Sequence, residues 1–356
     1  MDTIPNTTYF KGRGAQVNTP NKFAAQQYTA EHLEGLDEPF LENSATQLIE
    51  EYPRKIISVS NSPDLPMAYS VNPYQGCEHG CIYCYARNAH EYWGYSAGLD
   101  FERKIIVKRN AAEVLERQFN AKGYKPKVIM LSGNTDCYQP VERQLRITRA
   151  ILEVMVDYKH PVSIISKNSL ILRDIDLLAE LARHQLVHVA ITLNSLNEEL
   201  RQKMEPRTVT ANGRLAVMRQ LSDAGIPVML MCAPIIPGLN SSEMPALIEA
   251  AAAHGARAAS YTIVRLNGAI SELFVDWVHK AFPERAAKVL HGIAACHGGK
   301  LNDSRWGVRI GGEGNEAAGI KQLFRLGMAR HMPEAGLTPL RLDLFTPKSG
   351  RQLHLF

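Results

Sequence analysis

The sequence predicts an α/β fold built on a parallel β-sheet. The chain has 356 residues, of which 45% are hydrophobic and 21% charged, so it is long enough to bury a large core. Short apolar runs rich in β-branched residues alternate with longer stretches of helical period. Buried parallel strands read as continuous apolar runs, while the helices between them carry one apolar stripe. This alternation indicates a parallel sheet, arranged either as a barrel or as a doubly wound sheet.

The individual elements follow from this pattern in order. The predicted strands are Val128–Leu131, Val162–Ile165, Val187–Leu193, Val228–Met231 and Tyr261–Val264. The predicted helices between them are Val141–Tyr158, Leu170–His184, Arg214–Ala224 and Glu243–His254. The segment LSDAGIPVML shows one junction, where a helix ends at Gly225 and a strand begins after Pro227.

Extensions are expected on both sides of a core at residues 66–297. Residues 1–65 are expected to be loop-rich, with one helix near Ala45–Glu51. Past Ala269 the pattern turns helical, and residues 298–356 form the C-terminal extension. That extension is predicted to carry a helix near Ala317–Met328 and to end in either a hairpin or a loose tail.

The net charge of +4 is unevenly distributed along the chain. Residues 1–66 carry five Lys/Arg against nine Asp/Glu, whereas residues 298–356 carry nine against five. A basic barrel and tail can meet an anionic partner such as a nucleic acid. Ordinary surface charge is the alternative interpretation, because a modest excess is weak support for a partner.

No segment suggests secretion or a membrane. The first residues contain no apolar run, and the longest apolar stretch, Ile226–Leu239, is short and contains three prolines. We therefore expect a cytoplasmic protein with reduced cysteines. Clustered cysteines in that compartment indicate a metal site or catalysis rather than disulfides.

Three of the six cysteines lie in NPYQGCEHGCIYCYAR, which runs from Asn72 to Arg87. Cys77, Cys81 and Cys84 are spaced C-x3-C-x2-C. A [4Fe–4S] cluster usually takes four thiolates, so three leave one iron open to a small molecule. The alternative is a zinc site with His79 or His90 as the fourth ligand, although neither spacing matches the usual zinc pattern.

The cysteine motif, with an aromatic residue before its last cysteine, resembles the signature of radical S-adenosylmethionine (SAM) enzymes. The longer loop, together with SGNTDCYQPVERQLRITRAILEV and DAGIPVMLMCAPIIPGLN, resembles the DNA repair photolyase and spore photoproduct lyase-like branch. The resemblance covers roughly residues 50–330. It implies an α/β fold of partial (β/α)6 parallel barrel type. It also implies SAM bound to the open iron, cleavage of SAM to a 5′-deoxyadenosyl radical, and a reductant such as flavodoxin or ferredoxin.

Polar residues end three successive predicted strands and supply candidate SAM contacts. Thr135 and Asp136 follow the first strand, and Ser166 and Lys167 follow the second. Ligands of parallel α/β folds bind at these carboxyl ends. We expect Asp136 to receive the SAM ammonium group and Lys167 to pair with its carboxylate.

Further contacts are expected at the later strands. Thr192 and Asn194 are placed to reach the ribose or the carboxylate, Ile235 and Ile236 to wall the adenine, and Tyr83 to stack there. For each of these residues the alternative is a turn-forming polar group or an apolar core residue. Candidate contacts at the ends of four strands, all expected at the same mouth of the fold, favour a SAM site over this alternative.

The resemblance does not define the substrate. Spore photoproduct lyases use a cysteine hydrogen donor shortly before the Asp of this turn, where Gly133 stands here. Cys137 and, further along, Cys232 are the remaining candidate hydrogen donors, but a free cysteine is more often a small buried hydrophobe. A nucleic acid substrate stays possible, and the sequence gives no oligomeric state.

A second class of function remains open. The chain can be a non-catalytic Fe–S or zinc protein that binds nucleic acid on the same scaffold. Lys167 and Asp136 discriminate between the two, because such a scaffold has no use for charges aimed at SAM. Arg207 is ambiguous as well, since it can clamp a phosphate or carboxylate or pair with Glu205.

Overall fold

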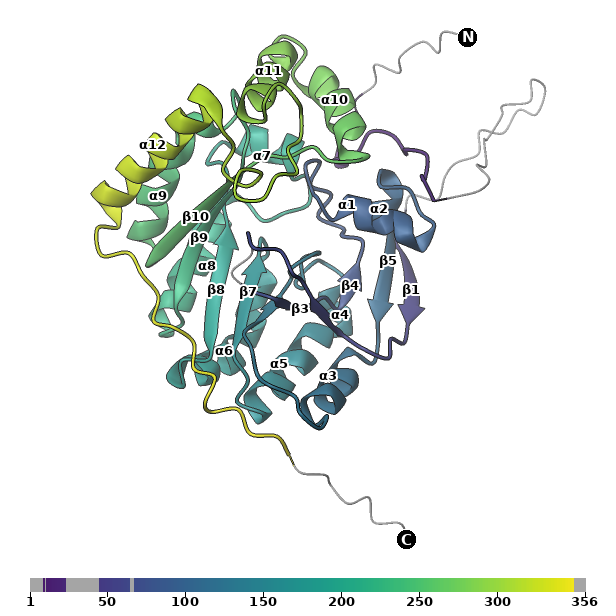
Figure 1. Cartoon of the computed structure of the whole chain (residues 1–356), viewed down its shortest axis with the longest axis vertical. Coiled ribbons are helices and arrows are strands. Elements are labelled where there is room, and N and C mark those ends of the chain that lie inside the picture. Colours follow the sequence, from purple (N-terminus) through teal and green to yellow (C-terminus); the bar gives the residue numbers. More distant parts are fainter. Residues whose placement is uncertain (1–8, 10, 24–44, 65–66, 349–356) are drawn as a thin grey trace, which may run out of the picture.

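The computed structural model describes residues 9, 11–23, 45–64 and 67–348 (Figure 1). A seven-stranded sheet forms its centre, with strand order β10-β9-β8-β7-β6-β3-β2. Its parallel strands are β3 (Tyr69–Val71), β6 (Ile129–Leu131), β7 (Val162–Ser166), β8 (Val187–Thr192), β9 (Val228–Ile235) and β10 (Ala258–Ile263). The short strand β2 (Ile57–Val59) pairs antiparallel to β3 at one edge. Because β2 and β10 are the two edges, the sheet is the partial barrel that the sequence predicts.

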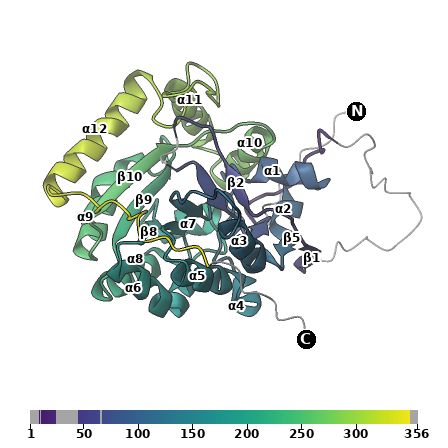
Figure 2. The ribbon, with the colours of Figure 1, turned by 60° about the horizontal axis from the view of Figure 1, so that its bottom comes forward.

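Helices cover the outer side of this sheet and lie beyond its last strand. The helices between the parallel strands are α3 (Ala111–Phe119), α4 (Glu142–Leu145), α5 (Ile147–Asp157), η2 (Ser169–Asp174), α6 (Ile175–Arg183), α7 (Glu198–Met204), α8 (Ala211–Asp223), η3 (Ser241–Glu243) and α9 (Met244–Ala253). Figure 2 shows α5, α6, α8 and α9 outside the strands. After β10 come α10 (Ile270–Ala281), α11 (Ala286–Cys296) and α12 (Gly314–His331), the last packed against α9.

A second, three-stranded sheet lies beside the barrel and was not predicted. It consists of β1 (Gln47–Glu51), β5 (Lys104–Lys108) and β4 (Tyr74–Gln75), next to α1 (Arg87–His90), η1 (Glu91–Trp93) and α2 (Leu99–Arg103). The helix expected near Ala45–Glu51 is therefore wrong. That segment has good local helix propensity, but its backbone pairs in parallel with the buried strand β5, and this long-range pairing overrides the local preference.

The five predicted strands are confirmed, while two of the predicted helices are interrupted. The predicted helix over 141–158 breaks between α4 and α5, where Arg146 adopts a φ of 54°. The predicted helix over 170–184 begins as the 3-10 segment η2. The helix near Ala317–Met328 is α12, and residues 338–348 form no hairpin. The rest of the tail lies outside the described residues, and the domain boundaries at 65 and 297 stay predictions.

The C-terminal extension bridges the open side of the sheet. The Ile263 amide donates to the Ile310 carbonyl at 2.9 Å, and the Leu266 amide donates to the Leu301 carbonyl at 3.0 Å, so this segment follows the end of β10. Asp64, in the connection between β2 and β3, accepts from Arg309 Nε at 2.5 Å and from the Gly307 amide at 2.7 Å. These contacts link both edges of the sheet.

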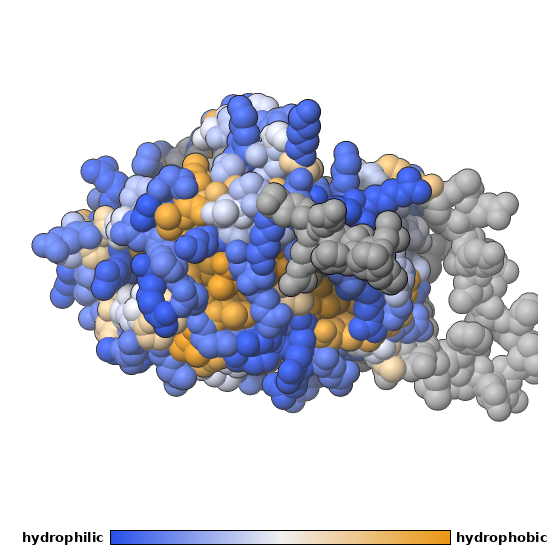
Figure 3. Space-filling model, turned by 90° about the horizontal axis from the view of Figure 1, so that it is seen from below, coloured by the Kyte–Doolittle hydropathy of each residue, from blue (hydrophilic) through white to orange (hydrophobic). Residues whose placement is uncertain are grey.

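The carboxyl ends of the parallel strands lie on one side of the sheet, where ligands bind in such folds. The opposite end, seen from below in Figure 3, shows apolar groups at its centre surrounded by hydrophilic ones. Within the described ranges, no helix is long and apolar enough to cross a membrane.

The Asp64 contacts give a first prediction. Asp64→Ala removes the carboxylate that satisfies Arg309, whose side chain is 17% exposed. We expect a loss of about 1–3 kcal/mol in the free energy of unfolding, measured by urea denaturation. The exposed pair Arg341–Asp343 supplies the control, because Asp343→Ala is expected to cost less than about 0.5 kcal/mol. Equal effects of the two variants would contradict the bridging role of Asp64.

Candidate functional site

The three motif cysteines lie in the connection between β4 and α1. All three are free thiols, Cys77 and Cys81 are buried, and Cys84 is half-buried. Burial raises the pKa of each thiol, and the nearby charges of Asp136, Cys81 and Cys84 raise the pKa of Cys77 further. The loop thus brings three thiols together where little water reaches them. A metal that binds these cysteines as thiolates displaces their protons.

Two glycines allow the tight path of this cysteine loop. Gly76 and Gly80 have φ values of 77° and 68°, in the left-handed region that favours glycine. A Cβ on Gly76 would lie 2.7 Å from the Lys104 carbonyl oxygen, and one on Gly80 would lie 2.8 Å from a Glu102 carboxylate oxygen. Any side chain at either position would push the cysteines out of place.

A buried ion pair lies beneath the cysteine loop. Arg87 and Glu102 are both fully buried, with Nη2 and Oε1 2.5 Å apart. Arg87 also donates to the carbonyls of Cys81 at 3.0 Å and Gly80 at 3.2 Å, and its other nitrogen binds the carbonyls of Ala97 and Gly98. The guanidinium therefore fixes the backbone that carries the second cysteine.

The N-terminal extension covers the other side of the loop. The Ala15 amide donates to Glu102 Oε1 at 2.8 Å, and Ala15 is fully buried. A Cβ on Gly14 would lie 1.7 Å from the Gly80 carbonyl oxygen, so the two backbones touch. This segment shields the cysteine loop from water. No motif in the sequence predicted this contact.

The structure brings Asp136, Ser166 and Lys167 together at the ends of β6 and β7. The Ser166 hydroxyl donates to Asp136 Oδ1 at 2.9 Å, and the Lys167 amide donates to Asp136 Oδ2 at 2.8 Å. His79 Nδ1 lies 3.4 Å from Asp136 Oδ2. Burial lowers the pKa of His79 to about 4 despite Asp136, so this imidazole is neutral near pH 7. Asp136 therefore has no cationic partner at His79.

The Lys167 ammonium lies near the cysteines. Its positive charge lowers the pKa values of Cys81 and Cys84 against the larger rise caused by burial. The side chain is half-buried, and in the described part of the chain no hydrogen bond or ion pair engages its ammonium group. A half-buried cation with this freedom is suited to receive an anionic ligand group beside the cysteines.

The other predicted SAM contacts differ in whether their polar groups already have a hydrogen-bond partner. The Thr135 hydroxyl donates to the Tyr74 carbonyl at 2.7 Å, whereas the buried Thr192 hydroxyl has no hydrogen-bond partner among the described residues. Asn194 Nδ2 donates to the Tyr83 hydroxyl at 3.3 Å. Ile235 is fully buried in the main core. It can therefore contribute to the shape of a ligand wall without being exposed itself.

The ion pair considered between Arg207 and Glu205 is wrong. Glu205 is fully buried, and it binds the Tyr83 hydroxyl and the guanidinium of Arg214. Arg214 also donates to the Thr192 carbonyl at 2.9 Å, which ties this network to the end of β8. Arg207 is left exposed to solvent.

The candidate hydrogen donors lie in the core. Cys137 and Cys232 are fully buried members of the main hydrophobic cluster, a placement that favours the packing role for both. The Cys137 amide is held by the Ser132 hydroxyl at 2.6 Å. Gly133 lies at the mouth, where its carbonyl accepts from the exposed Tyr85 hydroxyl at 2.6 Å.

The zinc alternative gains no support from the geometry. Across residues 9, 11–23, 45–64 and 67–348, no three His, Cys, Asp or Glu side chains converge on one metal-ion position. His79 Nε2 faces Asn168 Nδ2 at 3.1 Å, and His90 packs edge-on against Phe101. A [4Fe–4S] cluster instead binds its thiolates on separate irons, so it does not require them to meet at one ion.

Sequence reasoning missed Arg265, which lies two residues after the end of β10. Its side chain is half-buried, and its pKa is lowered by that burial and by nearby Arg309. No hydrogen bond or ion pair holds its guanidinium within the described residues, although Tyr85 and Asp64 lie near enough to influence its charge. The position after a predicted strand was the only signal for it.

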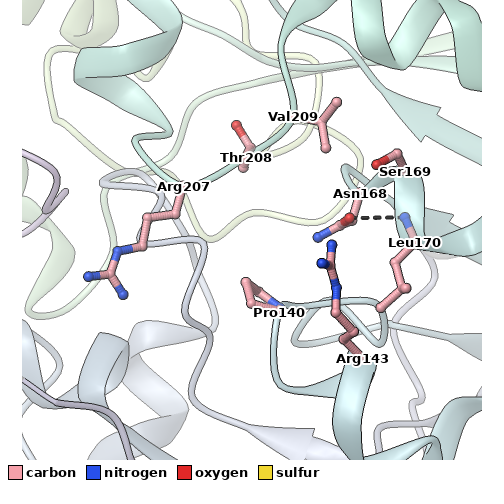
Figure 4. Close-up of a pocket in the computed structure, with 8 residues that line it drawn as sticks. All are labelled: Pro140, Arg143, Asn168, Ser169, Leu170, Arg207, Thr208 and Val209. Atoms are coloured by element: carbon pink, nitrogen blue, oxygen red, sulfur yellow. Dashed lines mark hydrogen bonds between the residues drawn. The ribbon is translucent and has the colours of Figure 1, made fainter.

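A pocket of about 260 Å³ lies beside the cysteine loop (Figure 4). Its lining residues come from three connections at the strand ends: Pro140, Arg143, Asn168, Ser169, Leu170, Arg207, Thr208 and Val209. We call it the arginine pocket. Figure 4 shows Arg143 pointing towards Asn168, while Arg207 points away from Arg143.

Comparison of the sequence with known proteins identifies relatives over most of this region. Residues 71–251 match the Radical SAM superfamily. An uncharacterized protein of Mycobacterium tuberculosis (strain H37Rv) is 34% identical over 232 residues, which cover 65% of this chain and 68% of that relative. An uncharacterized protein of Methanocaldococcus jannaschii is 30% identical over 201 residues, or 56% of this chain and 72% of the relative.

Solved structures with the same fold include spore photoproduct lyase. The lyase complexed with dinucleoside spore photoproduct aligns with a TM-score of 0.60 and 15% identity, over 82% of each chain. A variant of that lyase with bound AdoMet and dinucleoside spore photoproduct aligns with a TM-score of 0.57, also at 15% identity and 82% of each chain. At this identity the likeness shows the fold alone.

The Arg87–Glu102 pair gives the second prediction. Arg87→Ala leaves the Glu102 carboxylate buried without its cation, so we expect the free energy of unfolding of the metal-free chain to fall by about 3–5 kcal/mol. Urea denaturation under reducing conditions measures the loss. The double variant Arg87→Met/Glu102→Leu removes both charges and is expected to recover only part of the loss, because the carbonyls that Arg87 binds and the Ala15 amide still lose their partners. A loss below about 1 kcal/mol in Arg87→Ala would show that the pair does not hold the loop.

Proposed function

This chain belongs to the radical SAM superfamily, and we propose that Cys77, Cys81 and Cys84 hold its [4Fe–4S] cluster and that it reductively cleaves SAM. Members of the superfamily use a [4Fe–4S] cluster and SAM. When bound, this pair supplies a 5′-deoxyadenosyl radical. The observation that carries the proposal is the set of three free thiols in one loop, two of them buried and the third half-buried, with the Lys167 ammonium and the Asp136 carboxylate beside it.

The charges at the mouth match the two ends of an amino acid group. Asp136 is fixed by Ser166 and by the Lys167 amide, and we propose that its carboxylate receives the SAM ammonium. The Lys167 ammonium is proposed to pair with the SAM carboxylate. Each is a charge-assisted hydrogen bond in a place of low exposure, where such contacts are strongest.

The remaining groups are proposed to orient the nucleoside part of SAM. The buried Thr192 hydroxyl lacks a partner among the described residues, so a ribose hydroxyl would satisfy it. Asn194 lies beside the Tyr83 hydroxyl, and Ile235 with its neighbour Ile236 offers an apolar wall. The N-terminal extension over the loop would keep water from the radical.

We propose an anionic substrate, with nucleic acid as the first candidate. Arg265 supports it, because a half-buried guanidinium at the end of a barrel strand gains from an anionic partner. One solved relative is complexed with a dinucleoside spore photoproduct. Gly133 has no side chain that can give a hydrogen atom and Cys137 is buried, so we propose a reaction other than thymine dimer repair.

A non-catalytic nucleic-acid-binding protein on the same scaffold fits the site less well. Such a protein would leave the Lys167 ammonium half-buried without use. The Lys167 ammonium gains a partner when a zwitterionic ligand binds beside the cysteines.

The SAM contacts give the third prediction. Asp136→Ala and Lys167→Ala are each expected to weaken SAM binding by about tenfold or more, because a charge-assisted contact contributes about 1.5–3 kcal/mol. Equilibrium binding to the anaerobically reconstituted chain, with iron content and the reduced EPR spectrum as checks, measures the change. Lys159→Ala, at an exposed turn after α5, is the matched control. Unchanged affinity in both variants, with the cluster intact, would refute the placement of SAM.

The substrate proposal gives the fourth prediction. Arg265→Gln is expected to weaken binding of a short single-stranded oligonucleotide by about tenfold at low salt, since one buried charge contact is lost. Fluorescence anisotropy measures the affinity, and Arg257→Gln, an exposed arginine before β10, is the control. If the unaltered chain does not bind the oligonucleotide even at low salt, nucleic acid is the wrong substrate class.

A further inference from the structure

The arginine pocket touches the cysteine loop through both of its walls. Gln139, which precedes one wall, donates its side-chain amide to the Gly76 carbonyl at 3.1 Å and accepts from the Glu78 amide at 3.0 Å. The Arg207 amide donates to the His79 carbonyl at 3.4 Å. The pocket therefore lies against residues 76–79, the turn that begins at Cys77.

The charge around this pocket is positive. None of its eight lining residues is acidic, and two are exposed arginines, Arg143 and Arg207. Within the part of the chain that the structure describes, no ion pair engages either guanidinium. Clustered charge of one sign attracts a partner of the opposite sign and speeds its approach.

SAM cleavage consumes one electron, and the proposed function requires a donor for it. In the proposed function this electron comes from outside, and the rate of electron transfer falls steeply with distance. A donor protein must therefore dock where the cysteine loop is nearest to the surface. Cys77 and Cys81 are only 6% and 7% exposed, and Cys84 is half-buried. On the side of Cys77, the donor must therefore settle on the residues that surround the loop.

We propose that the arginine pocket is the docking surface for an acidic one-electron carrier protein of the flavodoxin or ferredoxin kind. The inference rests on the proposed function. The carrier loses one electron, the cluster held by the cysteines gains it, and no atom is transferred. Carboxylates on the carrier pair with Arg143 and Arg207. Such transient redox contacts are small, under about 1,200 Å², so a two-arginine anchor next to the loop is sufficient.

The test compares two reductants on one variant. The change is Arg143→Glu/Arg207→Glu, made in the full chain with its cluster reconstituted. We expect the rate of cluster reduction by reduced flavodoxin to fall by about tenfold or more at low salt, because attraction becomes repulsion. Raising the salt should shrink the difference, since salt screens exposed charges. Reduction by dithionite, and SAM cleavage driven by dithionite, should stay within about twofold of the unaltered chain.

The outcomes separate this proposal from the proposed function. The control Arg325→Glu/Arg330→Glu makes the same charge change on exposed positions of α12 and should leave the flavodoxin rate near that of the unaltered chain. An unchanged flavodoxin rate in the pocket variant overturns the docking surface. An equal loss with dithionite also overturns it, because the pocket would then serve SAM, substrate or folding. Failure of the unaltered chain to cleave SAM with dithionite overturns the proposed function instead.

Discussion

The buried Arg87–Glu102 ion pair is the interaction on which the site depends. Arg87 binds the carbonyls of Gly80 and Cys81 within the cysteine loop, and Glu102 binds the Ala15 amide from the N-terminal extension. One fully buried pair thus holds the cysteine loop from beneath and its cover from above. Buried charges of this kind are costly when unpaired, so the loss of either residue is expected to disrupt the hydrogen bonds of both.

The repeating part of the fold was predictable because it follows local rules. The five predicted parallel strands are largely apolar runs whose side chains are buried or half-buried on both faces, and the pattern shows in the sequence. β3 was missed because its sequence, Tyr-Ser-Val, is not a continuous apolar run and only Val71 is buried, and β1 because its pairing with β5 overrides a helix-like composition. The contact between Asp64 and Arg309 joins segments 245 positions apart, which no local pattern reveals.

The candidate site divides in the same way. The sequence showed the cysteine spacing, and it placed Asp136, Ser166 and Lys167 after predicted strands. The structure brings Asp136, Ser166 and Lys167 together. Arg87 sits inside the motif, but its role depends on Glu102, which only the folded chain places beneath it. Cys137 follows Asp136 directly, yet its side chain points into the core. The arginine pocket combines three connections, so the sequence could show Arg207 but not its neighbours.

The central claim is that the loop of Cys77, Cys81 and Cys84 supports reductive cleavage of SAM. The most direct measurement is 5′-deoxyadenosine formed by the anaerobically reconstituted chain with dithionite and SAM, with each cysteine replaced by alanine in turn as the control. The account predicts 5′-deoxyadenosine and methionine in equal amounts from the unaltered chain, and none from any of the three variants. A chain that holds its cluster and binds SAM but forms no 5′-deoxyadenosine would contradict it.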